Sequence, residues 1–344
     1  MRIAVDAMGG DHGVAVVIEG VKLALAGIPS ITELHLVGLE DEIRSLMGTQ
    51  GLSDPRVIVH HASQVLTMED KPMDALRKKK DCSMVRAIGL VRDAKADAII
   101  SRGNTGGLFA ASSVLLRPIE GVKRAAIAAV IPTQHNEFVL LDAGANVECR
   151  PEHLVHFAIM GSVYSRQMLG YEKPRVGVLS NGTEESKGTE LTQETLKLLR
   201  RIDLNFIGYV EGHDLFENRV EVVVCDGFVG NIVLKTIESL ATGMVHWLKD
   251  ELSANPKRML GALLAKNALR SIKRRMDPDA YGGAPLLGLN GTVLKAHGSA
   301  KEKSISSAIR VACETSTNQI SEIIFREVQR ANLSLPPETA TQPA

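Results

Sequence analysis

Short apolar runs alternate with longer segments of helical period along most of the chain, and this alternation limits the possible folds more than any other feature. The apolar runs lack polar residues at every second position, so they are typical of parallel strands that are covered on both faces. Strands that alternate with helices predict a three-layer α/β/α sandwich with a mostly parallel sheet. The predicted strands are RIAVDAM, LHLVG, RVIVHH, DAIISR, AAIAAVIP, FVLLDAG, RVGVLS and VEVVVCDG, and the predicted helices include Val14–Ala26, Met84–Ala94, Pro151–Leu169 and Thr189–Arg201.

The later part of the chain departs from simple alternation. AAIAAVIP and EFVLLDAG follow each other so closely that we expect a hairpin, which makes the sheet mixed. The C-terminal third contains two long predicted helices, Gly230–Lys249 and Ser304–Arg330, with a basic helical excursion at about 250–278 between them. We expect one α/β domain over residues 1–335 and a disordered tail, rich in Pro and Thr, over 336–344.

Composition excludes several classes of function. The 344 residues are 44% hydrophobic and carry a formal net charge of zero, so no overall field draws the protein to nucleic acid. Only 3% of the residues are aromatic, which leaves little surface for stacking bases. The four cysteines are far apart and form no C-x-x-C pair, so we expect no metal site. No signal peptide and no run of 18 apolar residues is evident, and we expect a cytoplasmic protein.

Glycine-rich polar segments follow the predicted strands. In an open α/β sheet, ligands bind beyond the carboxyl ends of the strands. Glycine lets the backbone approach a ligand closely, and the N–H groups at the start of a following helix bind anions. One such segment alone is more often a simple turn, but together they predict a shared ligand site at one edge of the sheet. The segments are DAMGGDHG (6–13), SRGNTGG (101–107), DAGAN (142–146), SNGTEESKGT (180–189), DGFVGN (226–231) and LNGTVLKAHGSA (289–300).

The segment GTEESKGT, Gly182–Thr189, contains a rearranged phosphate-binding motif. A nucleotide-binding P-loop reads G-x-x-x-x-G-K-S/T, whereas here the lysine precedes the second glycine. Lys187 would lie at the start of a helix with Thr189 as its cap. A lysine there opposes the helix dipole, which is favourable only when an anion lies beside it. The alternative is a solvated surface lysine that is balanced by Glu184 and Glu185.

The order and spacing of these segments, together with VEGHD (210–214), resemble the bacterial phosphate acyltransferases of phospholipid synthesis, over the chain up to about Arg330. The resemblance implies a homodimeric enzyme that transfers a long-chain fatty acyl group from acyl carrier protein to inorganic phosphate. The acyl phosphate would then serve a membrane glycerol-3-phosphate acyltransferase. The resemblance also implies a fold similar to phosphotransacetylases and isopropylmalate dehydrogenases, and no metal or organic cofactor.

The chain departs from the family pattern at three positions. Arg102 stands where a small residue precedes G-N-T-G, and it either crowds the pocket or adds a phosphate ligand. Tyr209 replaces an asparagine. Cys82 replaces a serine, and we interpret it as a substitution of similar size rather than as a nucleophile.

The residues favour direct attack of phosphate on a thioester, since no G-x-S-x-G nucleophile motif occurs. Positioning and electrostatic stabilisation would then account for the rate. We expect Lys187 to balance the phosphate charge and Asn231 to stabilise the oxyanion or position the substrate. His297 and Lys295 could reach the site, although a structural role for His297 is favoured. The predicted phosphate-binding residues are Gly103, Asn104, Thr105, Gly106, Asn181, Gly182, Thr183, Lys187 and Gly188, and the predicted pocket residues are Asp6, Gly9, Gly10, Asp142, Asn146, Asp226, Gly227 and His297.

The basic excursion predicts an interaction surface. Its apolar residues, such as Leu260, Leu263 and Leu264, follow helical spacing on one face. It could pack on the body or on a dimer partner, lie on an anionic membrane surface, or dock the acidic carrier protein. We therefore expect a cytoplasmic protein with peripheral membrane association. The basic residues are Lys257, Arg258, Lys266, Arg270, Lys273, Arg274 and Arg275.

Three other functions are considered. A phosphotransacetylase-like enzyme that uses acyl-CoA is the nearest alternative. A dehydrogenase would need the G-x-G-x-x-G register, which GNTGG lacks. A lipid-sensing scaffold without enzymatic activity would explain the basic excursion but not the glycine-rich segments.

Overall fold

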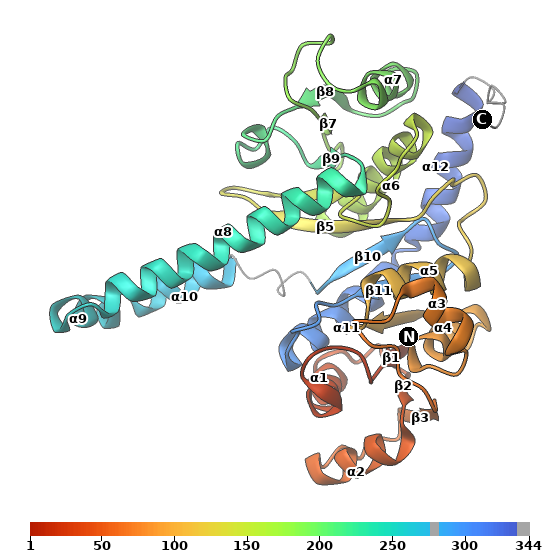
Figure 1. Cartoon of the computed structure of the whole chain (residues 1–344), viewed down its shortest axis with the longest axis vertical. Coiled ribbons are helices and arrows are strands. Elements are labelled where there is room, and N and C mark those ends of the chain that lie inside the picture. The colour runs from red at the N-terminus through yellow and green to blue at the C-terminus, as the bar shows by residue number, and fades with distance from the viewer. Residues whose placement is uncertain (276–281, 336–344) are drawn as a thin grey trace.

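The computed structural model describes residues 1–275 and 282–335, and its centre is one sheet of eleven strands (Figure 1). The strand order is β3-β2-β1-β4-β11-β10-β5-β6-β9-β7-β8. The strands are β1 (Arg2–Asp6), β2 (Glu33–Gly38), β3 (Val57–His61), β4 (Ala98–Ser101), β5 (Ala126–Pro132), β6 (Glu137–Leu141), β7 (Val176–Leu179), β8 (Phe206–Val210), β9 (Val222–Val224), β10 (Ala284–Leu287) and β11 (Thr292–Lys295).

Three changes of strand direction divide the sheet. β10 pairs antiparallel with both β11 and β5, and β5 pairs antiparallel with β6. The expected hairpin is therefore confirmed, with Ala128 opposite Leu141. All other paired strands are parallel. As a result β6, β9, β7 and β8 run opposite to β1, β4 and β11.

Helices cover both faces of the sheet, which confirms the predicted sandwich. Ile3 and Val5 of β1 pack in the core under α1 and α11, whereas Ala4 between them packs in the core on the opposite face with residues of α4 and α5. Both sides of the strand are thus buried, which explains its uninterrupted apolar run. The helices are α1 (Gly13–Gly27), α2 (Glu40–Gln50), α3 (Pro72–Lys78), α4 (Ser83–Arg92), α5 (Thr105–Leu115), α6 (Pro151–Leu169), α7 (Glu190–Leu199), α8 (Gly227–Ser253), α9 (Pro256–Leu264), α10 (Lys266–Arg275), α11 (Glu302–Thr317) and α12 (Ile320–Ser334).

The predicted single helix over Ser304–Arg330 is wrong, because α11 ends at Thr317 and α12 begins at Ile320. Gln319 between them has a φ of 51°, in the left-handed region that ends a helix. The Asn318 amide donates to the Gln167 carbonyl oxygen at 3.0 Å, which fixes this corner against the end of α6.

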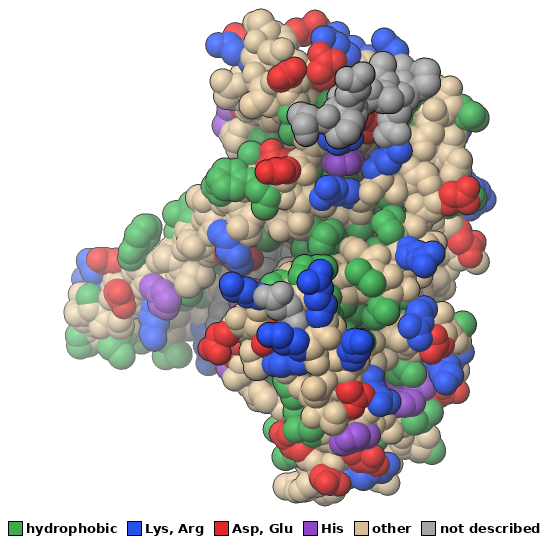
Figure 2. Space-filling view, turned by 45° about the vertical axis from the view of Figure 1, so that its right-hand side comes forward, with side chains coloured by type: hydrophobic (Ala, Val, Ile, Leu, Met, Phe, Trp, Pro, Cys, Tyr) green, Lys and Arg blue, Asp and Glu red, His purple; other side chains and the backbone are tan. Residues whose placement is uncertain are grey.

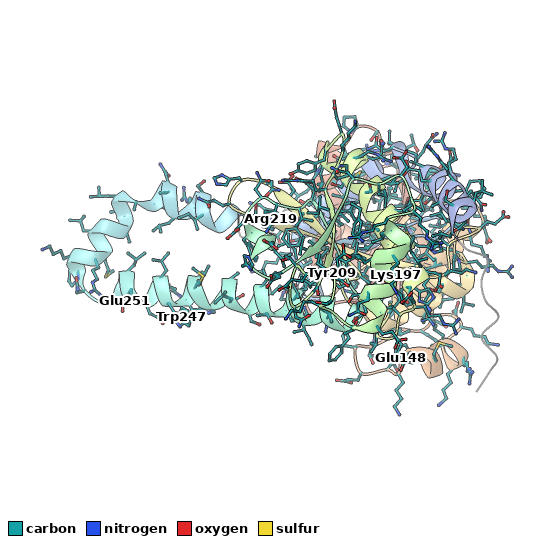
Figure 3. All side chains as sticks on the ribbon, turned by 90° about the horizontal axis from the view of Figure 1, so that it is seen from above. Glu148, Lys197, Tyr209, Arg219, Trp247 and Glu251 are labelled. Carbon is teal, nitrogen blue, oxygen red and sulfur yellow. The ribbon has the colours of Figure 1, made fainter. Side chains whose placement is uncertain are left out.

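The helices α8, α9 and α10 form an arm, residues 227–275, that extends away from the sheet (Figures 1 and 3). Val233, Leu234 and Ile237 in the first turns of α8 pack on the core, whereas Trp247 is 65% exposed. By length and composition α8 is apolar enough to cross a membrane, although it contains no uninterrupted run of 18 apolar residues. Only 6% of its apolar window is buried.

The arm corresponds to the basic excursion that the sequence predicted, although it begins earlier. Within the described residues the excursion forms two helices, α9 and α10. Figure 2 shows hydrophobic side chains along the arm. Residues 276–278 of the excursion, the side chains of Lys273, Arg274 and Arg275, and the tail 336–344 lie outside the described residues.

Candidate active site

The loops that follow β1, β4 and β11 meet in one cluster, which we call the N-terminal cluster (residues 6–13, 101–104 and 295–300). The buried Asp6 carboxylate accepts a hydrogen bond from the Ser101 hydroxyl at 2.6 Å, and that hydroxyl accepts one from the Gly103 N–H at 3.0 Å. A side-chain carbon on Gly9 would lie 2.5 Å from the Gly103 nitrogen. Two backbones therefore touch at this point, and only glycine allows the approach.

Two buried cations hold this cluster together. Arg102 is 2% exposed, and its guanidinium donates to the carbonyl oxygens of Ala300 at 3.1 Å and Gly13 at 2.9 Å. The Lys295 ammonium donates to the carbonyl oxygens of Arg102 and Ala296. Burial and the nearby charge of Arg102 lower the pKa of Lys295 to about 8. Arg102 thus ties the glycine-rich loops to each other.

The loops after β6 and β9 form a central cluster (residues 142–146 and 225–231) around the fully buried Asp142. Its carboxylate accepts hydrogen bonds from the backbone N–H groups of Ile127, Gly144, Ala145 and Asn146 and from the Asn146 side chain. Burial raises the pKa of Asp142, against the opposing effect of these donors. The Gly227 N–H donates to the Asn146 carbonyl oxygen at 2.7 Å, which joins the two loops.

The start of α8 connects the two clusters. Asp226 caps the helix by accepting from the Val229 N–H at 2.9 Å. Asn231, in the next turn, is exposed and lies against Gly144, with its Oδ1 3.4 Å from where a side-chain carbon on Gly144 would lie. Lys235, one turn later, is close enough for its charge to help lower the pKa of Lys295. Asn231 and Lys235 lie one turn apart on the same face of α8. This face therefore extends from the central cluster toward the N-terminal cluster.

The loop after β7, residues 180–189, folds over the start of α7. Thr189 and Thr192 form a reciprocal cap, in which each side-chain oxygen accepts from the other residue's N–H. The Asn181 side chain accepts from the Gly188 N–H at 3.0 Å. The Gln193 amide lies within hydrogen-bond distance of the carbonyl oxygens of Ser186 and Lys187, at 3.2 and 3.3 Å. The loop is thus held by its own side chains and by those of Thr192 and Gln193 on α7.

The electrostatics of this loop bear on the two interpretations of Lys187. Glu185 pairs with Arg200 rather than with Lys187. Within residues 1–275 and 282–335, the exposed Lys187 ammonium has no ion-pair partner. A free cation therefore lies at the start of a helix, where it opposes the helix dipole. The Glu184 carboxylate and the Lys187 side chain both lie 2.8 Å from the position that a side-chain carbon on Gly182 would occupy, so an anion site at Lys187 stays a prediction.

The expectation that all glycine-rich loops meet at one edge of the sheet is wrong. It assumed that their strands are parallel, whereas β6, β9 and β7 run opposite to β1, β4 and β11. The central cluster and the 180–189 loop leave the sheet at the same end. Among the described residues, no hydrogen bond or ion pair joins residues 103–107 to residues 181–189. A phosphate ligand shared by these two segments stays a prediction.

Several predicted site residues have structural contacts. Asn104 caps α5 through the Gly107 N–H at 2.9 Å, and its amide lies within 3.4 Å of the carbonyl oxygens of Thr67, Met68 and Asp70. His297 is exposed, and its Nδ1 forms a hydrogen bond with the Ser299 hydroxyl at 2.7 Å. Cys82 is buried, and burial raises the pKa of its thiol, which disfavours a nucleophilic role.

Ser101, Thr192 and Gln193 make contacts in these loops but are not among the site residues predicted from the sequence. The pair Thr189 and Thr192, spaced three residues apart before an apolar helix, was the available signal for a reciprocal cap. The contacts of Ser101 and Gln193 depend on how the chain folds back, and no local sequence pattern predicts them.

The comparisons with known proteins decide the family. A family model described as "Fatty acid synthesis protein" matches residues 1–323. A phosphate acyltransferase of Desulfitobacterium hafniense is 47% identical over 332 residues, which cover 96% of this chain and 98% of that protein. The phosphate acyltransferase of Akkermansia muciniphila is 42% identical and covers 99% of each chain. The chain belongs to the phosphate acyltransferase family. It is therefore an acyltransferase.

Solved structures agree on the fold of this phosphate acyltransferase family member. A phosphotransacetylase from Streptococcus pyogenes has a TM-score of 0.64 at 16% identity, covering 92% of this chain and 94% of that one. A branched-chain phosphotransacylase from Enterococcus faecalis has a TM-score of 0.53 at 15% identity, covering 92% of this chain and 99% of that one. At these identities the likeness concerns the fold alone.

Proposed function

We propose that this enzyme transfers a long-chain fatty acyl group from acyl carrier protein to inorganic phosphate, releasing an acyl phosphate for phospholipid synthesis. The observation that carries the proposal is the free Lys187 ammonium at the start of α7. An anion beside it would balance the lysine charge and accept hydrogen bonds from N–H groups in the first turn of the helix. The name and coverage of the relatives support phosphate as that anion.

In the proposed reaction a phosphate oxygen attacks the thioester carbonyl carbon. The new C–O bond forms as the carbonyl becomes an oxyanion, and the C–S bond then breaks to release the thiolate. Phosphate is itself a nucleophile near neutral pH, so the protein's task is to hold it and to stabilise the oxyanion. The Asn231 amide, which makes no hydrogen bond within residues 1–275 and 282–335, would donate to that oxyanion.

The arm supports a proposal about partners and location. Its exposed apolar residues include Leu263 and Leu264, which are 64% and 82% exposed. The same helices carry Lys257, Lys266 and Arg270. We infer a homodimeric, cytoplasmic enzyme whose arm contacts an anionic membrane surface, where an acyl phosphate could pass to a glycerol-3-phosphate acyltransferase. Apolar burial and the attraction of basic residues to anionic lipid would act together there.

The test follows free thiol and acyl phosphate from palmitoyl-carrier protein, with and without phosphate, with palmitoyl-CoA as a second donor. We expect acyl phosphate that depends on phosphate and on the carrier-bound donor. Lys187→Ala should lower kcat/KM for phosphate about 10- to 100-fold, the usual effect of losing one charged contact. Lys197→Ala is the matched control, because Lys197 lies on the helix that follows this loop, α7, and pairs with Glu194 at 2.6 Å.

Each result separates one part of the proposal from another. Full activity in Lys187→Ala would move the phosphate site away from the 180–189 loop. A higher kcat/KM with palmitoyl-CoA than with palmitoyl-carrier protein would identify acyl-CoA, and not the carrier protein, as the acyl donor. Absence of acyl phosphate with either donor would reject the acyl transfer itself.

A further inference from the structure

The hydroxyl of Tyr209 is a buried polar group without a partner. Tyr209 lies on β8, the strand beside β7, and is 5% exposed. Its oxygen is inaccessible to solvent and makes no hydrogen bond within the described part of the chain. A buried hydroxyl without a hydrogen bond costs free energy, so its position calls for a partner that the folded chain alone does not supply.

This hydroxyl points at the 180–189 loop. It lies 3.3 Å from the position that a side-chain carbon on Gly188 would occupy. The hydroxyls of Ser180, at 3.2 Å, and Thr192 approach the same position. Gly188 has a φ of 83° and adjoins Lys187. Three hydroxyl groups thus converge beneath the loop at its one left-handed glycine.

The neighbouring hydroxyls do not use the Tyr209 proton. Thr192 is engaged with Thr189, since its oxygen accepts from the Thr189 N–H at 2.9 Å and lies 3.0 Å from the Thr189 carbonyl oxygen. Ser180 is 3.5 Å from the Asn181 amide oxygen. The Tyr209 O–H is therefore a spare donor, held on a rigid strand next to the start of α7.

The electrostatic surroundings suit a negative ligand. Lys187 has no ion-pair partner in residues 1–275 and 282–335, whereas Arg200, which also lies near Tyr209, pairs with Glu185. The first turn of α7 adds N–H groups and the positive end of the helix dipole. A phosphate oxygen accepts strong hydrogen bonds from such donors, because one partner is charged.

We propose that the Tyr209 hydroxyl is a direct phosphate ligand that donates to a phosphate oxygen held at the 180–189 loop. This inference rests on the proposed phosphate site and names one more of its residues. Lys187 supplies charge from the exposed side of the loop, and Tyr209 supplies a directional hydrogen bond from beneath it.

The experiment measures phosphate binding without catalysis, by titration calorimetry of the full-length protein with inorganic phosphate. Tyr209→Phe removes only the hydroxyl and should weaken phosphate binding about tenfold. Tyr171→Phe is the matched control, because the Tyr171 hydroxyl accepts from the Glu137 N–H at 3.4 Å, near the opposite end of β7. Phosphate KM should rise by the same factor in Tyr209→Phe, while KM for the acyl donor is unchanged.

The outcomes distinguish this inference from the proposed function. Unchanged phosphate affinity in Tyr209→Phe overturns the inference, and if Lys187→Ala still weakens binding the phosphate site itself stands. Unchanged affinity in both variants removes the phosphate from this loop. If Tyr209→Phe binds phosphate more weakly but the wild-type enzyme forms no acyl phosphate, Tyr209 is supported as a phosphate ligand and the proposed acyl transfer is rejected. A change in donor KM and kcat with constant phosphate affinity would assign Tyr209 a structural role and overturn the inference.

Discussion

The side chain of Asn231 lies directly against the backbone of Gly144, with its Cβ 3.3 Å from the position that a side-chain carbon on Gly144 would occupy. Gly144 has a φ of 139°, so the loop can pass close to the helix at this point. Asn231 is exposed, and its amide makes no hydrogen bond within the described residues. The contact therefore positions a free amide at the start of α8.

Asn231→Ala should lower kcat about 10²- to 10³-fold, the usual effect of removing one donor to an oxyanion. Stability should change little, because the side chain is exposed and its amide is unbonded in the described structure. Initial rates at saturating donor and phosphate measure the effect. Thr236→Ala is the control, since Thr236 is also exposed on α8. Equal activity in both variants would exclude Asn231 from the reaction.

Gly10 and Gly13 differ in what surrounds them, although both lie in the left-handed region, with φ of 91° and 68°. A side-chain carbon on Gly10 would lie 2.8 Å from the Gly298 carbonyl oxygen, whereas nothing lies within 4 Å of one on Gly13. Gly13→Ala should cost about 1–2 kcal/mol of unfolding free energy through backbone strain alone. Gly10→Ala should cost about 1–3 kcal/mol more through overpacking. Chemical denaturation measures both, and equal losses would contradict the close approach.

The sequence predicted the sandwich because it depends on local patterns. Apolar runs such as that of β1 identify strands, and helical periods identify the segments between them. The reversal of strand direction was only half predicted. The β5–β6 turn is local and visible, but β10 enters the sheet from a distant part of the chain, and its short run APLL carries no sign of its neighbours.

The candidate site was predictable in composition but not in contacts. Glycine-rich segments mark the loops, yet Arg102 is fully enclosed by segments that are distant in sequence, and its type alone predicts an exposed side chain. In the sequence, Tyr209 stands out only as a departure from the family pattern. Its unpartnered hydroxyl exists because β8 lies beside β7, which brings it under Gly188.

Because of Lys295, the free energy of unfolding should increase as the pH is raised above about 8. Its pKa is lowered from 10.5 to about 8, so between these values the unfolded chain holds a proton that the folded chain has lost. Raising the pH through this range therefore favours folding, while below about pH 8 both states are protonated and the full cost of burying the charge remains. Relative to Lys295→Met, wild type should gain up to roughly 3 kcal/mol of unfolding free energy across this range.

Urea denaturation of wild type and Lys295→Met at several pH values measures that gain, because the difference between the two proteins cancels the other titrating groups. Lys197→Met is the control, since its side chain is 64% exposed and should show no such gain. A constant difference between wild type and Lys295→Met from about pH 7.5 to 10.5 would mean that Lys295 titrates at its ordinary value in the folded protein.

The exposed leucines of the arm provide the last prediction. Leu263 and Leu264 lie at the end of α9, next to basic residues of α10. Burying a leucine side chain stabilises binding by about 1.5–3 kcal/mol, so replacing both by glutamate should weaken binding to vesicles of anionic lipid at least about a hundredfold. Leu333→Glu is the matched control, because Leu333 is 88% exposed on α12, outside the arm.

Vesicle co-sedimentation measures the binding, and light scattering of the same samples measures the oligomeric state. The membrane contact predicts weaker sedimentation of the double variant with an unchanged molar mass. A double variant that sediments like wild type contradicts it. If the variant becomes monomeric while vesicle binding is unchanged, these leucines pack against a second copy of the chain, because their apolar surface is then needed for association and not for lipid.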